Sequence, residues 1–221
     1  MQYMDLFSDN TGSEINEEEV KLETAIINDK EVKYDPREFE VLEDDEVKYL
    51  HYIGNGKNIR NPEGNTSCYR MFSYYEGQTL DLSNFDTSNV TDMSGMFYEC
   101  MFTVKFTLGD KFDTSNVTNM KHMFDYCDFP EKFTLGDKFD TSNVTNMSGM
   151  FYHCEFPGGF TLGDKFDTSN VTDMRCMFVD CRFPKGFSLG DKFDTSNVTS
   201  MFDMFRNCSK NFKIPDWYRN R

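Results

Sequence analysis

The sequence predicts an α/β repeat protein, a solenoid in which each stacked unit contributes one short strand and one short helical turn. The motif FDTSNVT recurs at a step of 27 residues. A unit of this length cannot bury its own apolar face, so neighbouring units must stack and share one continuous core. The copies of the motif begin at Phe85, Phe112, Phe139, Phe166 and Phe193.

The strand is predicted from the alternation that precedes each copy of the motif. Phe133 and Leu135 flank Thr134, and Gly136 then interrupts the pattern, as expected for a short strand that ends in a bulge or turn. The D-T-S-N residues that follow favour a corner, because their side chains form hydrogen bonds to the nearby backbone. The stacked strands are expected to form a parallel sheet along one side.

The helical turn is predicted from the segment M-x-x-M-F-x-x-C that follows. Its apolar residues recur at intervals of about three and four, which is the spacing of one helix face. In the first full copy they are Met93, Met96, Phe97 and Cys100. We expect Phe, Leu, Met and Cys side chains to fill the space between the strands and these turns.

Four regions are predicted along the chain. The first is acidic and poor in aromatic residues, which suits a flexible arm or a loosely attached strand. In the second, Asn55-Gly56 follows an apolar run and indicates a hairpin that would cap the first repeat. One degenerate and five full repeats come next, followed by an aromatic segment that covers the last repeat. These regions are residues 1–35, 36–66, 67–208 and 209–221.

Residues 80–100, which read LDLSNFDTSNVTDMSGMFYEC, resemble the repeats of the BspA-like family of bacterial surface proteins, which are of leucine-rich-repeat type. The resemblance covers about residues 67–208. It implies a right-handed, leucine-rich-repeat-like solenoid and an adhesive or protein-binding role, commonly on a cell surface. The first residues lack the pattern of a secretory signal, so a cytoplasmic location is expected, with the cell surface or secretion as the alternative if the start is truncated.

The charge of the chain narrows the class of partner. The formal net charge is −15, and residues 1–60 hold 16 acidic and 7 basic residues. This excess argues against direct binding of nucleic-acid phosphates, which need clustered Lys and Arg, and against attraction to an anionic membrane. We therefore expect another protein as the partner, although an acidic surface also serves solubility by itself.

Two recurring positions are interpreted as framework. The cysteine of each unit is expected in the core as a free thiol, because parallel side chains at equivalent positions are poorly placed for a disulfide or a zinc site. The Asn of N-V-T matches a glycosylation sequon, but its place at a corner favours hydrogen bonds between units. The cysteines are Cys100, Cys127, Cys154, Cys181 and Cys208, and the asparagines are Asn89, Asn116, Asn143, Asn170 and Asn197.

The candidate binding surface combines two kinds of position. The first kind is the row of outward threonines on the predicted strands, with the Asp-Lys pair that follows each glycine. The second kind differs between otherwise identical units, because framework residues must repeat and contact residues need not. The candidates are Thr107, Thr134, Thr161, Asp110, Asp137, Asp164, Lys111, Lys138, Lys165, Tyr126, Tyr152 and His153, with Tyr98, Asp125, Val179 and Arg182 as further variable positions.

No pattern in the sequence predicts catalysis, a metal site or a cofactor. His51, His122 and His153 do not recur and match no motif with a nucleophile or paired carboxylates. We therefore expect a non-enzymatic protein that presents a rigid repeat surface to a macromolecular partner. Three alternatives stay open: an acidic, phage-encoded inhibitor of a nucleic-acid-handling enzyme, a surface adhesion protein, and a self-assembling structural protein.

Overall fold

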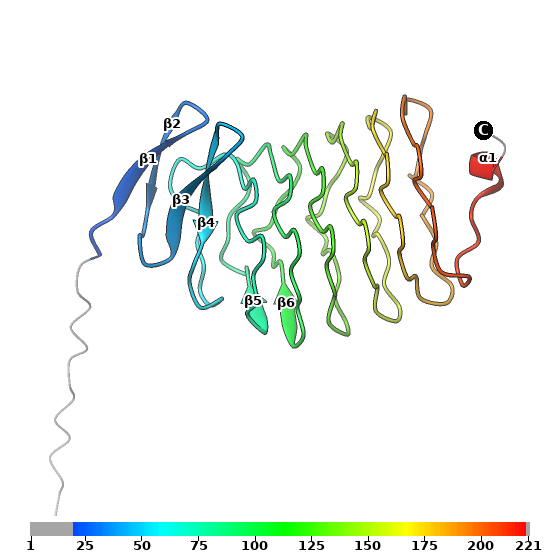
Figure 1. The fold of residues 1–221 in the computed structure, drawn as a ribbon, viewed down its shortest axis with the longest axis horizontal. Coiled ribbons are helices and arrows are strands. Elements are labelled where there is room, and N and C mark those ends of the chain that lie inside the picture. The colour runs from blue at the N-terminus through cyan, green and yellow to red at the C-terminus, as the bar shows by residue number, and fades with distance from the viewer. Residues whose placement is uncertain (1–19, 220–221) are drawn as a thin grey trace, which may run out of the picture.

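The computed structural model describes residues 20–219 and shows an elongated stack of loops with two hairpins at one end (Figure 1). The hairpins are antiparallel two-stranded sheets, and one short parallel pair lies within the stack. A short helix follows the last loop. The elements are β1 (Glu23–Ile27), β2 (Lys30–Tyr34), β3 (Phe39–Asp44), β4 (Val47–Tyr52), β5 (Thr79–Asp81), β6 (Lys105–Thr107) and α1 (Asp216–Arg219).

The prediction of a right-handed α/β solenoid of leucine-rich-repeat type is wrong. Within residues 20–219, α1 is the one helix, has four residues, and lies after the repeats. Most of the strand structure belongs to the antiparallel hairpins β1–β2 and β3–β4, and the repeats contribute only β5 and β6. No helix of this described part is long and apolar enough to cross a membrane.

Left-handed residues replace the expected helical turn in each unit. Gly95 and Glu99 have φ angles of 60° and 55°, outside the helical region. Three overlapping tight turns result, each closed by a backbone hydrogen bond between residues three apart. The N–H groups between these bonds point to the next unit, and the Phe97 N–H donates to the Met123 carbonyl at 2.9 Å. The apolar side chains therefore share one face without a helix.

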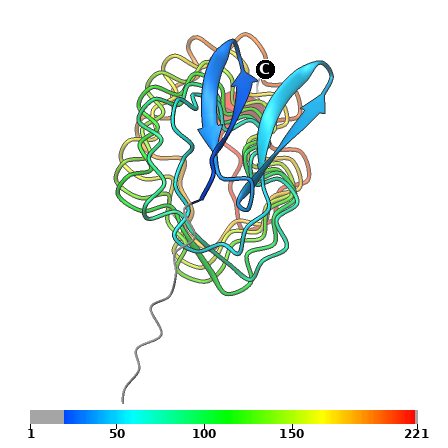
Figure 2. The same ribbon diagram turned by 90° about the vertical axis from the view of Figure 1, so that its left-hand side faces the viewer.

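These bonds hold successive 27-residue units side by side, so that they nearly superpose when seen along the stack (Figure 2). A ladder of parallel bridges at the start of these turns adds to them. It runs through the residue that precedes the first methionine of each full unit, or Cys68 in the degenerate one, namely Ser67, Asp92, Asn119, Asn146, Asp173 and Ser200. Backbone bonds at the D-T-S-N corner, as from the Thr87 N–H to the Lys111 carbonyl at 3.2 Å, join the units in a second segment.

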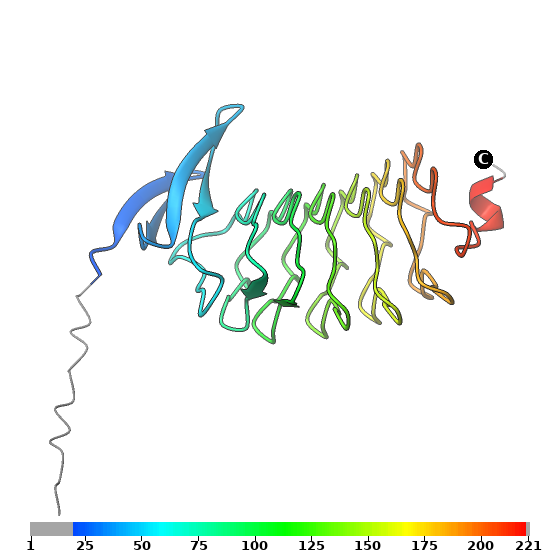
Figure 3. The same cartoon turned by 60° about the horizontal axis from the view of Figure 1, so that its bottom comes forward.

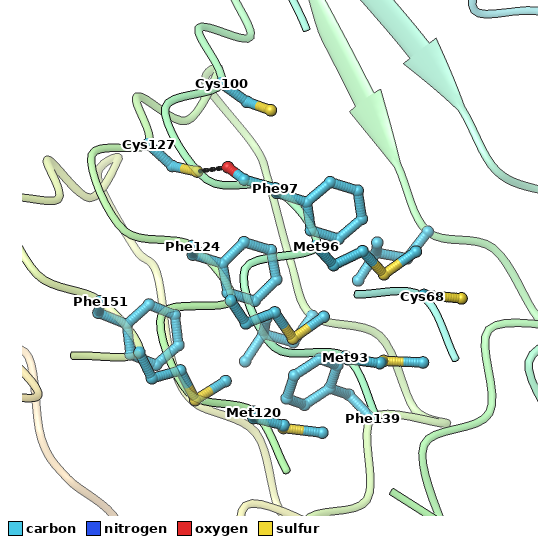
Figure 4. Close-up of a cluster of buried hydrophobic side chains, with 14 of the residues drawn as sticks. Cys68, Met93, Met96, Phe97, Cys100, Met120, Phe124, Cys127, Phe139 and Phe151 are labelled. Atoms are coloured by element: carbon cyan, nitrogen blue, oxygen red, sulfur yellow. Dashed lines mark hydrogen bonds between the residues drawn. The ribbon is translucent and has the colours of Figure 1, made fainter. Parts of the chain in front are cut away.

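A column of phenylalanine rings runs through the core. The Phe of each Met-Phe pair is buried, and each ring stacks on the next with centroids 5.3–5.7 Å apart and planes within 17° (Figure 4). Such offset ring pairs add about 0.5–1.5 kcal/mol beyond the area that they bury. The column consists of Phe72, Phe97, Phe124, Phe151, Phe178 and Phe205.

Proline turns prevent the predicted strand in most units. In the later units the Phe N–H that a strand would use is donated to a proline three residues earlier, as from Phe133 to the Pro130 carbonyl at 3.2 Å. Where the sequence lacks this proline, at residues 102–106, β6 pairs with β5 in a parallel sheet. The alternating Phe and Leu side chains are nevertheless buried in both cases, for example Phe106 and Phe133.

The recurring cysteines and asparagines both bond to a neighbouring unit. The buried Cys127 thiol donates to the Phe97 carbonyl at 2.9 Å, and the other four cysteines of the series make the equivalent bond (Figure 4). The Asn116 side chain donates to the Ser88 carbonyl at 2.8 Å. Asn143, Asn170 and Asn197 repeat this bond, and Asn89 is exposed on the first full unit.

The two ends of the stack are covered differently (Figure 3). The hairpins turn at Asn28-Asp29 and at Asp45-Glu46, where all four residues have positive φ. The prediction of a hairpin turn at Asn55-Gly56 is therefore wrong. The strands β1 and β2 lie within the segment predicted as an acidic arm, whereas residues 1–19 lie outside the described residues. At the other end Tyr218 of α1 packs on Phe205, with ring centroids 5.2 Å apart.

Replacing Phe124 by Ala should destabilise the protein by about 3–5 kcal/mol, because it removes a fully buried ring from the middle of the column. Urea denaturation followed by circular dichroism measures this loss. The matched control is Phe202→Ala, since Phe202 is 71% exposed. Equal stability of the two variants would contradict the role of the column.

Cys176 should react with iodoacetamide in the folded protein well before the recurring cysteines do. Burial raises the pKa of the Cys100 and Cys208 thiols to about 12, and only the thiolate reacts. Burial also raises the pKa of the Cys176 thiol, but Cys176 is half-buried and lacks the bond to a neighbouring unit's carbonyl that the thiols of the series make. Mass spectrometry of peptides labelled with and without urea measures the order, and Cys176→Ser should abolish the fast phase. Labelling of Cys127 as fast as Cys176 would refute this expectation.

Candidate functional site

The left-handed turn positions carry bulky side chains in several units. Glycine is the usual residue at positive φ, since other residues cost about 1–2 kcal/mol there. This chain nevertheless places Arg70, Tyr74, His122, Tyr126 and His153 at φ angles between 49° and 59°. Backbone strain of this kind concentrates at functional sites. These positions therefore indicate a candidate site.

Aromatic side chains of these turns form a row that we call the tyrosine ridge, defined as Tyr74, Tyr98, Tyr126, Tyr152 and His153. Tyr74 contacts Tyr98 edge-on with centroids 5.5 Å apart, and Tyr126 lies 5.6 Å from Tyr152. The His153 ring stacks on Tyr126 at 4.6 Å with the planes 8° apart. Tyr74 and Tyr126 stay 53% and 45% exposed, so the ridge presents aromatic surface to the solvent.

The side-chain pattern of the ridge has a period of two units rather than one. The Arg70 side chain lies over Gly95, where an added Cβ would come within 3.1 Å of the Arg70 Cγ. His122 covers Gly149 in the same way, with its Nδ1 2.3 Å from the position of a Cβ. A bulky residue in one unit is thus matched by glycine in the next. This alternation pairs the first four units and divides the ridge into two similar halves. The first half contains Tyr74 and Tyr98, and the second contains Tyr126, Tyr152 and His153.

A guanidinium lies within the first half of the ridge. The Arg70 group lies 5.8 Å from the centroid of the Tyr69 ring and 5.7 Å from that of Tyr98, within the range of cation–π contacts. Its Nη1 also contacts the Asp44 carboxylate at 2.5 Å. This half therefore binds an arginine of the chain itself.

The second half contains two histidine–carboxylate pairs. The His122 Nδ1 lies 2.7 Å from the Asp125 carboxylate, and the His153 Nε2 lies 3.0 Å from that of Asp180. Asp125 is 4% exposed, and its Oδ1 has no hydrogen-bond partner in the described structure. Burial raises the pKa of the Asp125 carboxyl, and the nearby His122 opposes this shift.

The remaining histidine is also paired, because His51 contacts the Glu40 carboxylate at 3.3 Å and the Ser73 carbonyl at 3.0 Å. The described residues contain no group of three His, Cys, Asp or Glu side chains arranged for a metal ion. What the ridge offers is ring faces, carboxylates and imidazoles on a rigid backbone. Those groups suit recognition of another macromolecule.

The candidates at the glycine turns occupy another segment of each unit. Thr134, Asp137, Thr161, Asp164 and Lys165 line a shallow groove of about 390 Å³ between two units. Lys138 does not pair within its own turn, and its Nζ lies 4.0 Å from the Asp113 carboxylate of the preceding unit. The other members of this set, Thr107, Asp110 and Lys111, occupy the equivalent turn of an earlier unit.

The variable positions divide between surface and core. Tyr126 and His153 are exposed, Tyr98 and Tyr152 are half-buried, and Arg182 pairs with Glu155 at 2.9 Å. Asp125 and Val179, named among the variable positions, are buried.

Sequence reasoning missed Tyr74 of the ridge, and it missed Arg70 and His122, which flank the ridge. A signal for Arg70 and His122 exists in the dipeptide before each of the first four Met-Phe pairs, where Ser-Gly alternates with Tyr-Arg and Lys-His.

The family comparison matches the repeats. A family model described as "Mycoplasma protein of unknown function, DUF285" matches residues 66–157 and 134–220, which together cover more than half of the chain. The chain belongs to this family. The match begins next to Ser67, where the bridge ladder of the DUF285 units also begins. Comparison with curated proteins and with solved structures produced no match.

Replacing Asp125 by Asn in this DUF285 protein should raise the melting temperature by about 2–4 °C at pH 7. A carboxyl whose pKa is raised in the folded state holds its proton better there than in the unfolded chain, so its ionisation lowers stability as pH rises. Asn has no such cost and still accepts a hydrogen bond from His122. Differential scanning calorimetry between about pH 4 and about pH 8 measures the difference in melting temperature, which should shrink as the pH falls.

The matched control for this pH dependence is Asp128→Asn, because Asp128 is exposed. A difference between wild type and the Asp125 variant that grows toward acidic pH would contradict the assigned direction.

Proposed function

We propose that this DUF285 protein is a non-enzymatic protein-binding module whose partner docks on the tyrosine ridge. The observation that carries the proposal is the placement of Tyr74, Tyr126 and His153 on left-handed turns of three different units. These turns are costly to form with such residues, and their side chains differ from unit to unit. Tyrosines and arginines dominate the binding energy of many protein interfaces.

The rigidity of the ridge supports this function. The left-handed turns are held by backbone bonds to the next unit, as from the Tyr126 N–H to the Tyr152 carbonyl at 2.8 Å. Rigid aromatic side chains lose little conformational entropy when they bind, so the ridge is preorganised for a partner. Because each turn belongs to one unit of a stack, the surface extends over the first four units.

The proposal includes a relation to the BspA-like repeats. The FDTSNVTxMxxMFxxC pattern resembles theirs, and members of that family serve in adhesion and protein binding. This resemblance favours a protein partner over a small molecule. A cell-surface adhesion role and inhibition of a nucleic-acid-handling enzyme are both forms of protein binding, and they differ in the partner.

Affinity capture tests the proposal through the triple variant Y126A/H153A/Y152A. A partner captured from the source organism or its associated cells should bind this variant at least about tenfold more weakly, since interface hot spots cost on the order of 1–2 kcal/mol each. Surface plasmon resonance with the purified partner measures the change in Kd.

The matched control is the variant T134A/T161A, which alters the groove at the glycine turns and leaves the ridge intact. This variant should bind the partner like the wild type. A partner that is lost with the groove variant and retained by the ridge variant would overturn the assignment of the ridge.

A further inference from the structure

We propose that the second half of the tyrosine ridge, around Tyr126 and Tyr152, binds an arginine side chain of the partner protein. This inference rests on the proposed function and names the chemistry that the ridge recognises. The partner segment would insert a guanidinium against the tyrosine rings, with the surrounding carboxylates as counter-charges.

The first half of the ridge provides an internal example of this recognition. There a tyrosine pair, Tyr74 and Tyr98, is accompanied by the Arg70 guanidinium, which lies 5.7 Å from the Tyr98 centroid. The same guanidinium is bound by the Asp44 carboxylate. An arginine held between a tyrosine face and a carboxylate is therefore a geometry that these turns accommodate.

The second half repeats the arrangement without the arginine. Tyr126 and Tyr152 form the equivalent pair with a centroid distance of 5.6 Å, close to the 5.5 Å of the first pair. His122 occupies the position of Arg70 and likewise covers the glycine of the next unit. However, His122 is turned toward Asp125 at 2.7 Å, and the group that lies against Tyr126 and Tyr152, at 4.6 and 4.7 Å, is the imidazole of His153.

Charge around the second half favours a cation. The Asp180 carboxylate lies 3.0 Å from the His153 Nε2, and the His153 ring stacks on Tyr126, so this acid borders the tyrosine pair. Glu99 is exposed on the preceding unit. With a net charge of −15 on the whole chain, an arginine is attracted to the ridge from a distance as well.

Arginine fits better than lysine for a geometric reason. The guanidinium is planar and weakly hydrated, so it stacks on a tyrosine face while its edge donates to carboxylates. Lysine offers only a compact, strongly hydrated charge. The rings of Tyr126 and His153 already stack with planes 8° apart, and a planar group extends such a stack.

The test measures fluorescence anisotropy of a fluorescein-labelled peptide of alternating glycine and arginine with the full chain. An ionic strength of about 0.15 M screens general attraction to the acidic surface. We expect the arginine peptide to bind more tightly than the same peptide with lysine. The variant Y126L/Y152L, which keeps every charge, should weaken the arginine peptide about tenfold, whereas Y126F/Y152F should retain its binding.

A second variant tests the comparison between the two halves. His122→Arg would place an internal guanidinium where Arg70 lies in the first half, at a nearly equal φ angle of 54° against 49°. It should compete with the peptide and weaken its binding although both tyrosines are present. Phe202→Leu, at an exposed aromatic position of a later unit, is the control that should leave binding unchanged.

Equal binding of the arginine and lysine peptides, or equal effects of Y126L/Y152L and Phe202→Leu, would overturn the inference. Melting temperatures of all variants confirm that each one is folded. The inference can fail while the proposed function holds. If a captured partner needs the ridge but the protein does not bind the arginine peptide, only the arginine specificity is refuted.

Discussion

Every second backbone N–H in the turns of one unit is donated to a carbonyl of the next, and the rest of the structure depends on this constraint. The Phe97 and Glu99 N–H groups bond to the Met123 and Asp125 carbonyls at 2.9 and 2.8 Å. Buried backbone groups must be paired, and the tight turns leave these groups without a local partner. The next unit has to supply one, so each unit is complete only within the stack.

This constraint also places the side chains of the core. Because equivalent backbone atoms are bonded to one another, equivalent side chains lie above one another, and the phenylalanine rings form a nearly parallel column. The Cys127 thiol reaches the Phe97 carbonyl for the same reason. Exact repetition of Phe, Met and Cys is therefore a packing requirement, and it leaves few positions free to vary.

The free positions are those of the turns themselves. A turn with a left-handed residue directs that side chain away from the core, so Tyr126 and His153 can differ from their equivalents without disturbing the stack. The same backbone bonds that stabilise the fold hold these side chains rigidly in a row. In this way the fold provides a preorganised surface for a DUF285 protein, and the alternation of His122 with Gly149 divides that surface into pairs of units.

The sequence by itself determined the repeat, its 27-residue step and the residues that fill the core, because a short unit can bury Phe97 or Met96 only by stacking. It also identified Tyr126, Tyr152 and His153 as positions that vary. It did not determine the backbone conformation: M-x-x-M-F-x-x-C has helical spacing, and nothing local to Glu99 or Tyr126 predicts positive φ. Only the tertiary structure decided that, since the hydrogen bonds that make those turns favourable go to residues in the next unit. For the same reason the partnership of Arg70 with Tyr98, and its absence around Tyr152, became visible only in the folded stack.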